Sequence, residues 1–293
     1  MTGRILEQAY RYCRWITYRH YENFPVASWI LPKAARPHIA AIYAFARAAD
    51  DFADETRYQG CSLELLGVWR KALRSCGNGT DNSAAWNHPI FLALGNTIRE
   101  CRLPVQWLED LLVAFTMDVT KRRYATWEEL LDYCRCSANP VGRLVLTVFG
   151  VHDPQLHHYS DRICTALQLA NHWQDLRIDL ARDVLYVPQV FLKEHGMEEK
   201  ALFAALKDPE IVSRPSFQAL MADLVRYARD LFDQGAPLIH RVSGRLRLEL
   251  KLTLLGGQAI LDRIESARYD VFQRRPVLSP WDKTRLLADA LLR

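Results

Sequence analysis

The sequence predicts a single domain built only from α-helices, and three observations lead to this prediction. Hydrophobic residues make up 49% of the 293 residues and charged residues 25%, which is typical of a packed globule and not of a disordered or fibrous chain. Almost every long segment repeats its apolar residues at positions i, i+3, i+4 and i+7, the period of an amphipathic helix. With only 13 Gly and 13 Pro, the chain has too few turn residues for an all-β protein.

In the N-terminal half, four helices are expected. Residues 35–55 are apolar on nearly every side, which predicts a buried helix rather than a surface one. The other three carry an apolar stripe on one side and cover residues 63–76, 88–101 and 105–122. The most loop-like stretch, from Gly77 to Asn87, is too short to separate two domains, so we expect one domain over residues 1–293.

The C-terminal half continues the helical pattern. Thr126 and Glu129 form a capping box at the start of a helix over residues 126–138, and Asn139-Pro140 is a turn signal after it. Three longer patterns cover residues 161–180, 217–235 and 246–267. The amphipathic run 280–293 predicts a terminal packing helix, with docking on a membrane surface as the alternative.

Composition narrows the possible functions. A net charge of +4 is far from the charge of a nucleic-acid-binding surface, so no nucleic acid is expected as a partner. No apolar run approaches the ~20 residues that cross a bilayer, and the N-terminus lacks a secretory signal, so we expect a cytoplasmic protein. The stretch Gly77-Asn78-Gly79 follows no predicted strand and lacks a third glycine, which argues against a dinucleotide site and against NADPH as a cofactor.

Some residue types that often mark a site have structural interpretations here. The seven cysteines are scattered and odd in number, so we interpret them as reduced and mostly buried thiols. His157, His158 and His172 do not have the spacing of a metal site. Four tryptophans are expected in the core or in a pocket wall: Trp15, Trp29, Trp127 and Trp173.

The helix over residues 35–55 carries a first acidic group. Asp50 and Asp54 are four residues apart, so their carboxylates project from the same helix face. Arg47 stands one turn before Asp50 on nearly the same stripe. Because buried carboxylates are unfavourable unless they are paired or bind metal, an acidic pair on an otherwise apolar helix indicates a possible metal site.

A second acidic group follows another apolar run. Asn171, Asp175 and Asp179 are successive i, i+4 neighbours, which places one amide and two carboxylates on one stripe. Two helices with such stripes can face one another and enclose hard cations. Mg²⁺ prefers oxygen ligands and often shares them with substrate phosphates, so the pattern favours Mg²⁺ bound with a phosphorylated substrate. A carboxylate di-iron site would require paired Glu-x-x-His motifs, which the sequence does not contain.

These acidic groups, with Tyr43 before the first and Tyr186-Val187-Pro188 after the second, make the sequence resemble the squalene/phytoene synthase family of isoprenyl diphosphate enzymes. Residues 22–28 (ENFPVAS) and 137–144 (SANPVGRL) are similar to the hydroxysqualene synthase branch of bacterial hopanoid biosynthesis. The resemblance extends from about residue 5 to 278. It implies an isoprenoid-synthase helical bundle around a central cavity.

The resemblance also implies roles for individual residues. The expected metal ligands, holding two or three Mg²⁺ ions with diphosphate, are Asp50, Asp51, Asp54, Asn171, Asp175 and Asp179. The expected catalytic residues are Tyr43, Arg47 and Tyr186. The expected substrate-binding residues are Asn23, Phe24, Arg47, Gly142, Gln168 and Arg274. Among these, Arg47 and Arg274 would hold the diphosphate, and Gly142 would mark a helix break that lets an isoprenoid tail lie close to the backbone.

Three positions depart from the pattern of family members that condense two prenyl diphosphates. Gln174 stands where an Arg usually precedes the Asp, and Asp183-Val184 stands where many members have Gly-Arg, a loss for which Arg182 could substitute. Gly257 stands where an aromatic residue is common. Fewer cations favour an enzyme that ionises one diphosphate rather than holding two.

The expected reaction is therefore the Mg²⁺-dependent ionisation of presqualene diphosphate, carbocation rearrangement and capture by water to give hydroxysqualene. The aromatic faces of Tyr43 and Phe45 are expected to stabilise the carbocation. The substrate, a long-chain isoprenoid diphosphate, implies hand-over from a presqualene diphosphate synthase and a possible peripheral contact with the inner membrane face. Two alternatives remain: condensation of two farnesyl diphosphates to presqualene diphosphate or squalene, and an inactive family member that serves as an assembly protein.

Overall fold

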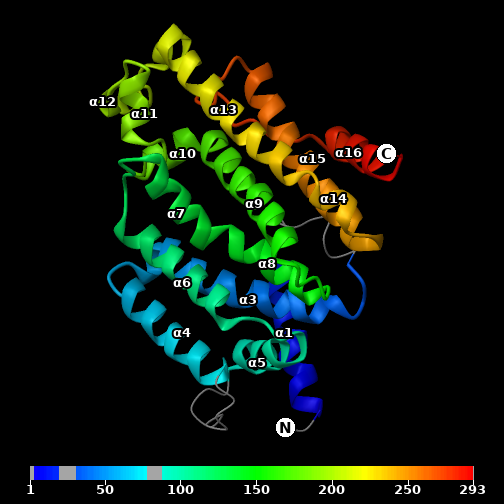
Figure 1. Cartoon of the computed structure of the whole chain (residues 1–293). Helices are drawn as coiled ribbons and strands as arrows, with labels where there is room; N and C mark the ends of the chain where they lie inside the picture. Colours follow the sequence, from blue (N-terminus) through cyan, green and yellow to red (C-terminus); the bar gives the residue numbers. More distant parts are fainter. Residues whose placement is uncertain (1–2, 20–30, 78–87, 293) are drawn as a thin grey trace. The chain divides into compact units, whose positions relative to one another are not determined.

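Helices provide nearly all the regular structure of the computed structural model, which describes residues 3–19, 31–77 and 88–292 (Figure 1). Within these ranges the only β contact is an isolated bridge between Arg123 and Leu185. The predicted all-α class is therefore confirmed. Contacts along the chain group residues 1–120 and 140–157 into one compact unit, and residues 121–139 and 158–293 into another. The expectation of a single domain stays a prediction.

The first unit is arranged around α3. Its helices are α1 (Gly3–Arg19), α3 (Ala35–Asp54), α4 (Ser62–Gly77), α5 (Pro89–Cys101), α6 (Val105–Thr120) and α8 (Asn139–Val148), with a 3₁₀ turn at Thr56–Tyr58. Helix α3 contacts α1, α4, α5 and α6. These four neighbours cover several faces of α3. Its sequence is therefore apolar on nearly every side. Its many alanines let the surrounding helices approach closely.

An aromatic cluster forms the core of this unit. The Phe45 ring on α3 is fully buried and stacks on Trp69 at 6.0 Å between ring centroids, and its edge meets Phe91 at 6.1 Å. The Trp69 indole N–H donates to the Phe45 carbonyl at 3.3 Å, which satisfies the polar atom of a buried ring. Truncation of such a ring to Ala typically removes about 3–5 kcal/mol of stability.

The second unit contains the remaining helices. They are α7 (Trp127–Ser137), α9 (Pro154–Gln174, of which residues 154–157 belong to the first unit), α10 (Leu176–Ala181), α11 (Gln189–Glu194), α12 (Glu199–Ala204), α13 (Pro215–Gly235), α14 (Leu238–Arg241), α15 (Gly244–Ser266) and α16 (Pro280–Leu292), with a 3₁₀ helix at Pro209–Ser213. Helix α15 contacts α13, α14 and α16. A Cβ atom added at Gly257 would lie 2.7 Å from Leu167 Cδ2 and closer still to the Phe232 ring, so this glycine allows α9 and α13 side chains to pack against α15.

The start of α7 and its end follow from local sequence. The Thr126 hydroxyl accepts from the Glu129 N–H at 3.4 Å, which confirms Thr126 as the N-cap. The Glu129 carboxylate accepts from the Ala125 N–H at 3.0 Å, so the returning bond of the predicted capping box goes to the residue before the cap. The helix ends at Ser137, because Pro140 cannot donate to the carbonyl of residue 136 and its ring clashes there. The break expected at Gly142 therefore lies at Ala138, and Gly142 is buried inside α8.

The terminal run packs as predicted. Leu286 and Ala290 of α16 are buried, Arg263 of α15 forms an ion pair with Asp282 at 2.6 Å, and Lys251 Nζ donates to the Ala290 carbonyl at 2.9 Å. None of the described helices combines the length and the apolar character needed to span a membrane. All seven cysteines are free thiols, as predicted; three are buried and four are partly buried.

Candidate active site

Helix α3 brings three carboxylates and one guanidinium together at its C-terminal end. Arg47 Nη2 lies 2.5 Å from Asp51 Oδ1, and Arg47 Nη1 lies 3.4 Å from Asp50 Oδ2. Asp54 is exposed one turn beyond Asp50. Within the described residues the Nε–H of Arg47 is buried and has no hydrogen-bond acceptor. One donor of the guanidinium is thus left for a further anion.

The first acidic group carries more negative charge than Arg47 can balance. Burial is the main cause that raises the pKa of Asp50 to about 6, and the neighbouring carboxylates of Asp54 and Asp51 raise it further against the opposing effect of Arg47. The Asp50 side chain nevertheless keeps 40% of its surface exposed, so a ligand can reach it. An all-oxygen donor set with excess negative charge fits a hard divalent cation.

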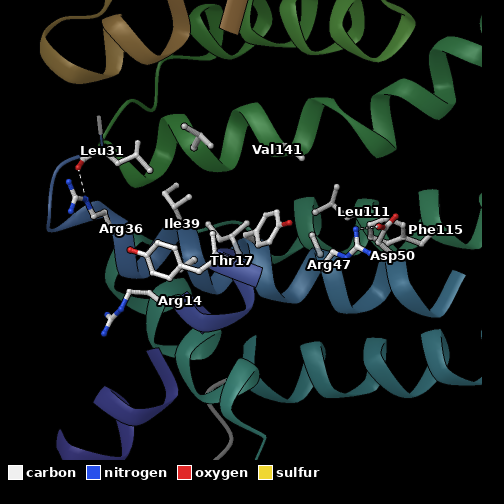
Figure 2. A pocket seen from close by; sticks show the side chains of 16 residues that line it. Arg14, Thr17, Leu31, Arg36, Ile39, Arg47, Asp50, Leu111, Phe115 and Val141 are labelled. Carbon is white, nitrogen blue, oxygen red and sulfur yellow. Dashed lines mark hydrogen bonds and ion pairs between the residues drawn. The ribbon is translucent and has the colours of Figure 1, made fainter. Parts of the chain in front are cut away.

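A cavity of about 270 Å³ lies along α3 inside the first unit. Helices α1, α3, α6 and α8 supply its walls, which are mainly apolar between its two ends. Figure 2 shows Arg47 and Asp50 at one end and Arg14 and Arg36 at the other. From Arg36 to Asp50 the helix rises by about 21 Å at 1.5 Å per residue. The cavity is therefore long and apolar, with the acidic group at one end.

Two aromatic residues of α3 were expected near the reacting carbons, and the structure places only one of them there. Tyr43 lines the cavity, and its partial burial raises the pKa of the phenol, so the hydroxyl stays protonated at neutral pH. The expectation for Phe45 is wrong, because this ring is fully buried between Trp69 and Phe91. Two residues correspond to 200° of helix rotation, which turns Phe45 to the opposite side of α3.

The second acidic group lies at a break between α9 and α10. Asp175 leaves the helical conformation, with φ −100° and ψ 9°, so the predicted helix over residues 161–180 is two helices. The Asp175 N–H still donates to the Asn171 carbonyl at 2.8 Å, and the Asp179 N–H donates to the Asp175 carbonyl at 2.9 Å. These two bonds keep the i, i+4 succession of the three residues.

Arg275, which the sequence analysis did not select, pairs with this second group. Its Nε and Nη2 atoms contact the two carboxylate oxygens of Asp175, the latter at 3.0 Å, and Nη2 also donates to the Gln174 side-chain oxygen at 3.3 Å. Gln174 is buried and its amide donates to the Pro276 carbonyl. Gln174 thus positions a cation that comes from another segment, which corrects the interpretation that a cation is simply missing there. Arg274 itself is exposed.

An aromatic cluster stands beside the second group in the same unit. The Tyr186 ring stacks on His172 at 3.6 Å between centroids, and Tyr124 and Tyr133 each lie 5.5 Å from Tyr186. The Gln168 amide nitrogen lies 3.4 Å from His172 Nε2. Burial lowers the pKa of His172 to about 3, so the imidazole is neutral at physiological pH. The sequence suggested Gln168 and Tyr186 but gave no sign that His172 connects them.

The departure at Asp183 has a local structural explanation. Asp183 has a positive φ of 61°, a conformation that glycine adopts readily and that aspartate tolerates better than most residues. Its carboxylate pairs with Arg123 Nη2 at 2.6 Å, and Arg123 Nε pairs with Glu199 at 2.5 Å. Asp183 is therefore engaged in a surface ion-pair network. Arg182 is exposed at the end of α10.

Some expected site residues are not brought together. Asn23 and Phe24 lie outside the described residues. The two acidic groups belong to different units. In the part of the chain that the structure describes, no three His, Cys, Asp or Glu side chains are placed so as to hold a metal ion by themselves. The roles given to the site residues remain predictions.

Comparison with known proteins gives consistent results. The family profile described as squalene/phytoene synthase matches residues 17–282. Hydroxysqualene synthase of Rhodopseudomonas palustris is 34% identical over 252 residues, which are 83% of this chain and 78% of that protein. The 15-cis-phytoene synthase of Synechococcus elongatus is 29% identical over 300 residues, 98% of this chain and 94% of that protein.

Similar folds occur among solved structures. The crystal structure of squalene synthase HpnC from Alicyclobacillus acidocaldarius superposes with a TM-score of 0.82 at 40% identity, covering 90% of this chain and 96% of that one. A dehydrosqualene synthase solved in complex with a ligand superposes with a TM-score of 0.84 over 98% of this chain and 96% of that one. Its identity of 20% shows a shared fold alone.

Proposed function

Because this chain belongs to the squalene/phytoene synthase family, as its acidic groups predict, we propose that it converts presqualene diphosphate to hydroxysqualene. The reaction ionises the carbon–oxygen bond to diphosphate, rearranges the cyclopropylmethyl cation and adds water, which loses a proton to leave the alcohol. The relatives named hydroxysqualene synthase, at 34–35% identity, support this choice within the family.

The observation that carries the proposal is the apolar cavity that ends at Arg47 and Asp50. An isoprenoid tail is a long hydrocarbon, and an apolar cavity along about 21 Å of helix matches it in length and polarity. A diphosphate at the acidic end would meet the buried, unpaired Nε–H of Arg47. The cavity therefore separates the two chemically different ends of one substrate.

Both acidic groups fit Mg²⁺ because their donors are all oxygens and their charge is in excess. Asp50 and Asp54, assisted by Asp51, would hold ions on α3, and Asn171, Asp175 and Asp179 would hold them on α9 and α10. When bound, the ions supply Lewis acidity that neutralises charge on the leaving diphosphate. Diphosphate oxygens would have to complete the coordination shell, since Mg²⁺ takes six ligands and favours phosphate.

The chain's own cations would hold the same leaving group. Arg47 offers a planar guanidinium at the cavity end, and Arg275 offers a second at Asp175; such a fork suits phosphate oxygens. Arg274, selected from the resemblance, is the neighbouring candidate. These groups are positioned before reaction, so they stabilise developing negative charge without reorganisation.

Tyrosines would act on the carbocation and on the water. Tyr43 presents an aromatic ring in the cavity wall, where its quadrupole favours a nearby cation. Its protonated hydroxyl can donate a hydrogen bond that orients water. Tyr186 is held by its stack on His172, which leaves it a fixed ring beside Gln168. The proton released on water capture would go to a diphosphate oxygen or to solvent.

A second function, condensation of two farnesyl diphosphates, has two observations in its favour. The structure named squalene synthase HpnC is 40% identical, and the alignment with the phytoene synthase of Synechococcus elongatus covers 98% of this chain. The third hypothesis, an inactive assembly protein, has no such support. A scaffold would not need the repelling carboxylates that raise the pKa of Asp50.

One incubation tests the proposal. The purified protein with Mg²⁺ should convert presqualene diphosphate to hydroxysqualene, take its oxygen from ¹⁸O-labelled water, and give no squalene when NADPH is added. It should do little with farnesyl diphosphate alone. Efficient formation of presqualene diphosphate from farnesyl diphosphate would instead establish the condensing function.

The cellular setting is part of the same proposal. The free thiols suit the reducing cytoplasm, where a separate presqualene diphosphate synthase would hand over the substrate. The long-chain substrate and product both favour a location at the inner membrane face.

A further inference from the structure

Helix α1 has an exposed face that the proposed reaction does not use. Its buried side, with Ala9, Tyr10 and Cys13, packs in the first unit. The opposite side exposes Trp15 at 47% and Tyr18 at 61% of their surfaces, together with Ile5 and Tyr12. Trp15 was expected in the core or a pocket wall, and this expectation is wrong. We define the α1 face as Arg4, Ile5, Arg11, Tyr12, Trp15, Tyr18 and Arg19.

The charge of this helix has one dominant sign. Four arginines stand on α1, at positions 4, 11, 14 and 19, against a single acid, Glu7, which pairs with Arg11 at 3.3 Å. The side chains are also organised: Tyr12 stacks on Trp15 at 5.8 Å, and the Arg19 guanidinium lies 4.3 Å from the Trp15 ring centroid. Exposed Trp and Tyr interleaved with Arg are typical of helices that lie in the interface of a membrane.

The same helix forms one end of the cavity. Arg14, Thr17 and Tyr18 line it, and Tyr18 belongs both to the cavity wall and to the α1 face. Figure 2 shows the Arg14 and Arg36 guanidinium groups at this end, directed away from the middle of the cavity. Arg36 Nε also donates to the Leu31 carbonyl at 2.8 Å. Cations at the end of an apolar cavity are placed to meet phosphate groups while the cavity meets hydrocarbon.

From these observations we propose that the α1 face docks on the surface of an anionic phospholipid bilayer, so that the cavity end at Arg14 and Tyr18 opens toward the lipid. The arginines would contact lipid phosphates, and Ile5, Tyr12 and Trp15 would enter the interface. The use of this opening to release an apolar product into the bilayer rests on the proposed function. The docking itself does not.

Vesicle co-sedimentation of the purified full-length protein tests the docking. The protein should bind vesicles of phosphatidylcholine mixed with phosphatidylglycerol, bind poorly to phosphatidylcholine alone, and detach as salt is raised. Arg4→Gln with Arg19→Gln should weaken binding roughly thirtyfold at low salt. Ile5→Ser with Trp15→Ser should weaken it about tenfold or more.

A matched control lies on α16, where Trp281 is 83% exposed and Leu291 is also exposed. Trp281→Ser with Leu291→Ser removes a similar apolar area from another helix and should leave binding unchanged. Loss of binding in this control but not in the α1 variants would overturn the proposal, as would equal binding to neutral vesicles or none at all. Dimerisation that Trp15→Ser abolishes, without vesicle binding, would assign the face to a protein partner instead.

The assay separates this proposal from the proposed reaction because it contains no isoprenoid substrate. The thermal midpoint of each variant establishes that it is folded. If the variant with Ile5→Ser and Trp15→Ser unfolds, the variant with Arg4→Gln and Arg19→Gln still decides the test. Docking without turnover of presqualene diphosphate would support the membrane surface and refute the reaction. Turnover without docking would do the reverse.

Discussion

Under the proposed function, single arginines would decide where a diphosphate is held at the second acidic group. Arg275 contacts both carboxylate oxygens of Asp175, and the buried Gln174 holds the segment in place through Pro276. Arg274 stands beside it, and both arginines are exposed, but among the described contacts Asp175 pairs with Arg275. Neighbouring residues of the same type, in different surroundings, provide a direct test of which cation is functional.

We expect Arg275→Gln to weaken binding of diphosphate with Mg²⁺ by about ten- to a hundredfold, because it removes one or two charge-assisted hydrogen bonds. Arg274→Gln should weaken it less than about threefold, because an exposed charge without the contact to Asp175 contributes little. Calorimetric titration of both variants gives the comparison. A larger loss for Arg274→Gln would restore the assignment made from the resemblance.

Glu249 on α15 provides a pH-dependent prediction away from the acidic groups. Burial raises the pKa of this carboxyl to about 7, and its Oε2 atom has no hydrogen-bond partner among the described residues. Because the folded pKa is above the unfolded value, Glu249 favours folding fully below about pH 4.5 and loses that contribution as pH rises through 7.

Glu249→Gln should therefore increase the free energy of unfolding by about 2 kcal/mol at pH 8, and change it little at pH 4.5. Urea unfolding at the two pH values measures the difference. An equal effect at both pH values would mean that the carboxyl does not titrate in this range.

The sequence could predict both acidic groups because i, i+4 spacing is a property of one helix. It could not predict Arg275, which lies 100 residues after Asp175 and reaches it through tertiary packing. Nor could it predict that Phe45 faces the core, since α3 is apolar on nearly every side and the pattern does not distinguish core from cavity.

At the scale of helices, periodicity found the long elements and missed the short ones. Helices α11, α12 and α14 have six, six and four residues, too few to show a helical repeat. Helix α1 was also not predicted, although its sequence is amphipathic. The position of a helix break depends on local residues. Because of Pro140, α7 ends before Ala138, and the break does not lie at Gly142.

Two adjacent glycines on α15 test how closely helices pack in the second unit. A Cβ at Gly257 would collide with Phe232 and Leu167, whereas a Cβ at Gly256 has nothing within 4 Å. Gly257→Ala should destabilise the protein by about 1–3 kcal/mol through overpacking. Gly256→Ala should stabilise it by about 0.5–1 kcal/mol through helix propensity. Thermal unfolding of both variants measures the opposite signs.

The proposed function requires both acidic groups, which belong to different units of the chain. Mg²⁺ alone should bind weakly and diphosphate alone should meet repelling carboxylates, but together they should raise the thermal midpoint by more than the sum of the separate shifts. Asp50→Asn should abolish this excess while leaving the ligand-free midpoint equal or slightly higher. Purely additive shifts would contradict a shared site.

The pairing of Arg47 with Asp51 and of Arg275 with Asp175 has a kinetic consequence. Each guanidinium already has an internal anion, so under the proposed function an incoming diphosphate would meet the Nε–H of Arg47 directly but would have to displace a carboxylate to gain the other N–H donors. The same carboxylates reclaim the arginines when the leaving diphosphate departs, which lowers the barrier to its escape. We therefore expect weak product inhibition by diphosphate, with turnover limited by the slower departure of the hydrocarbon product.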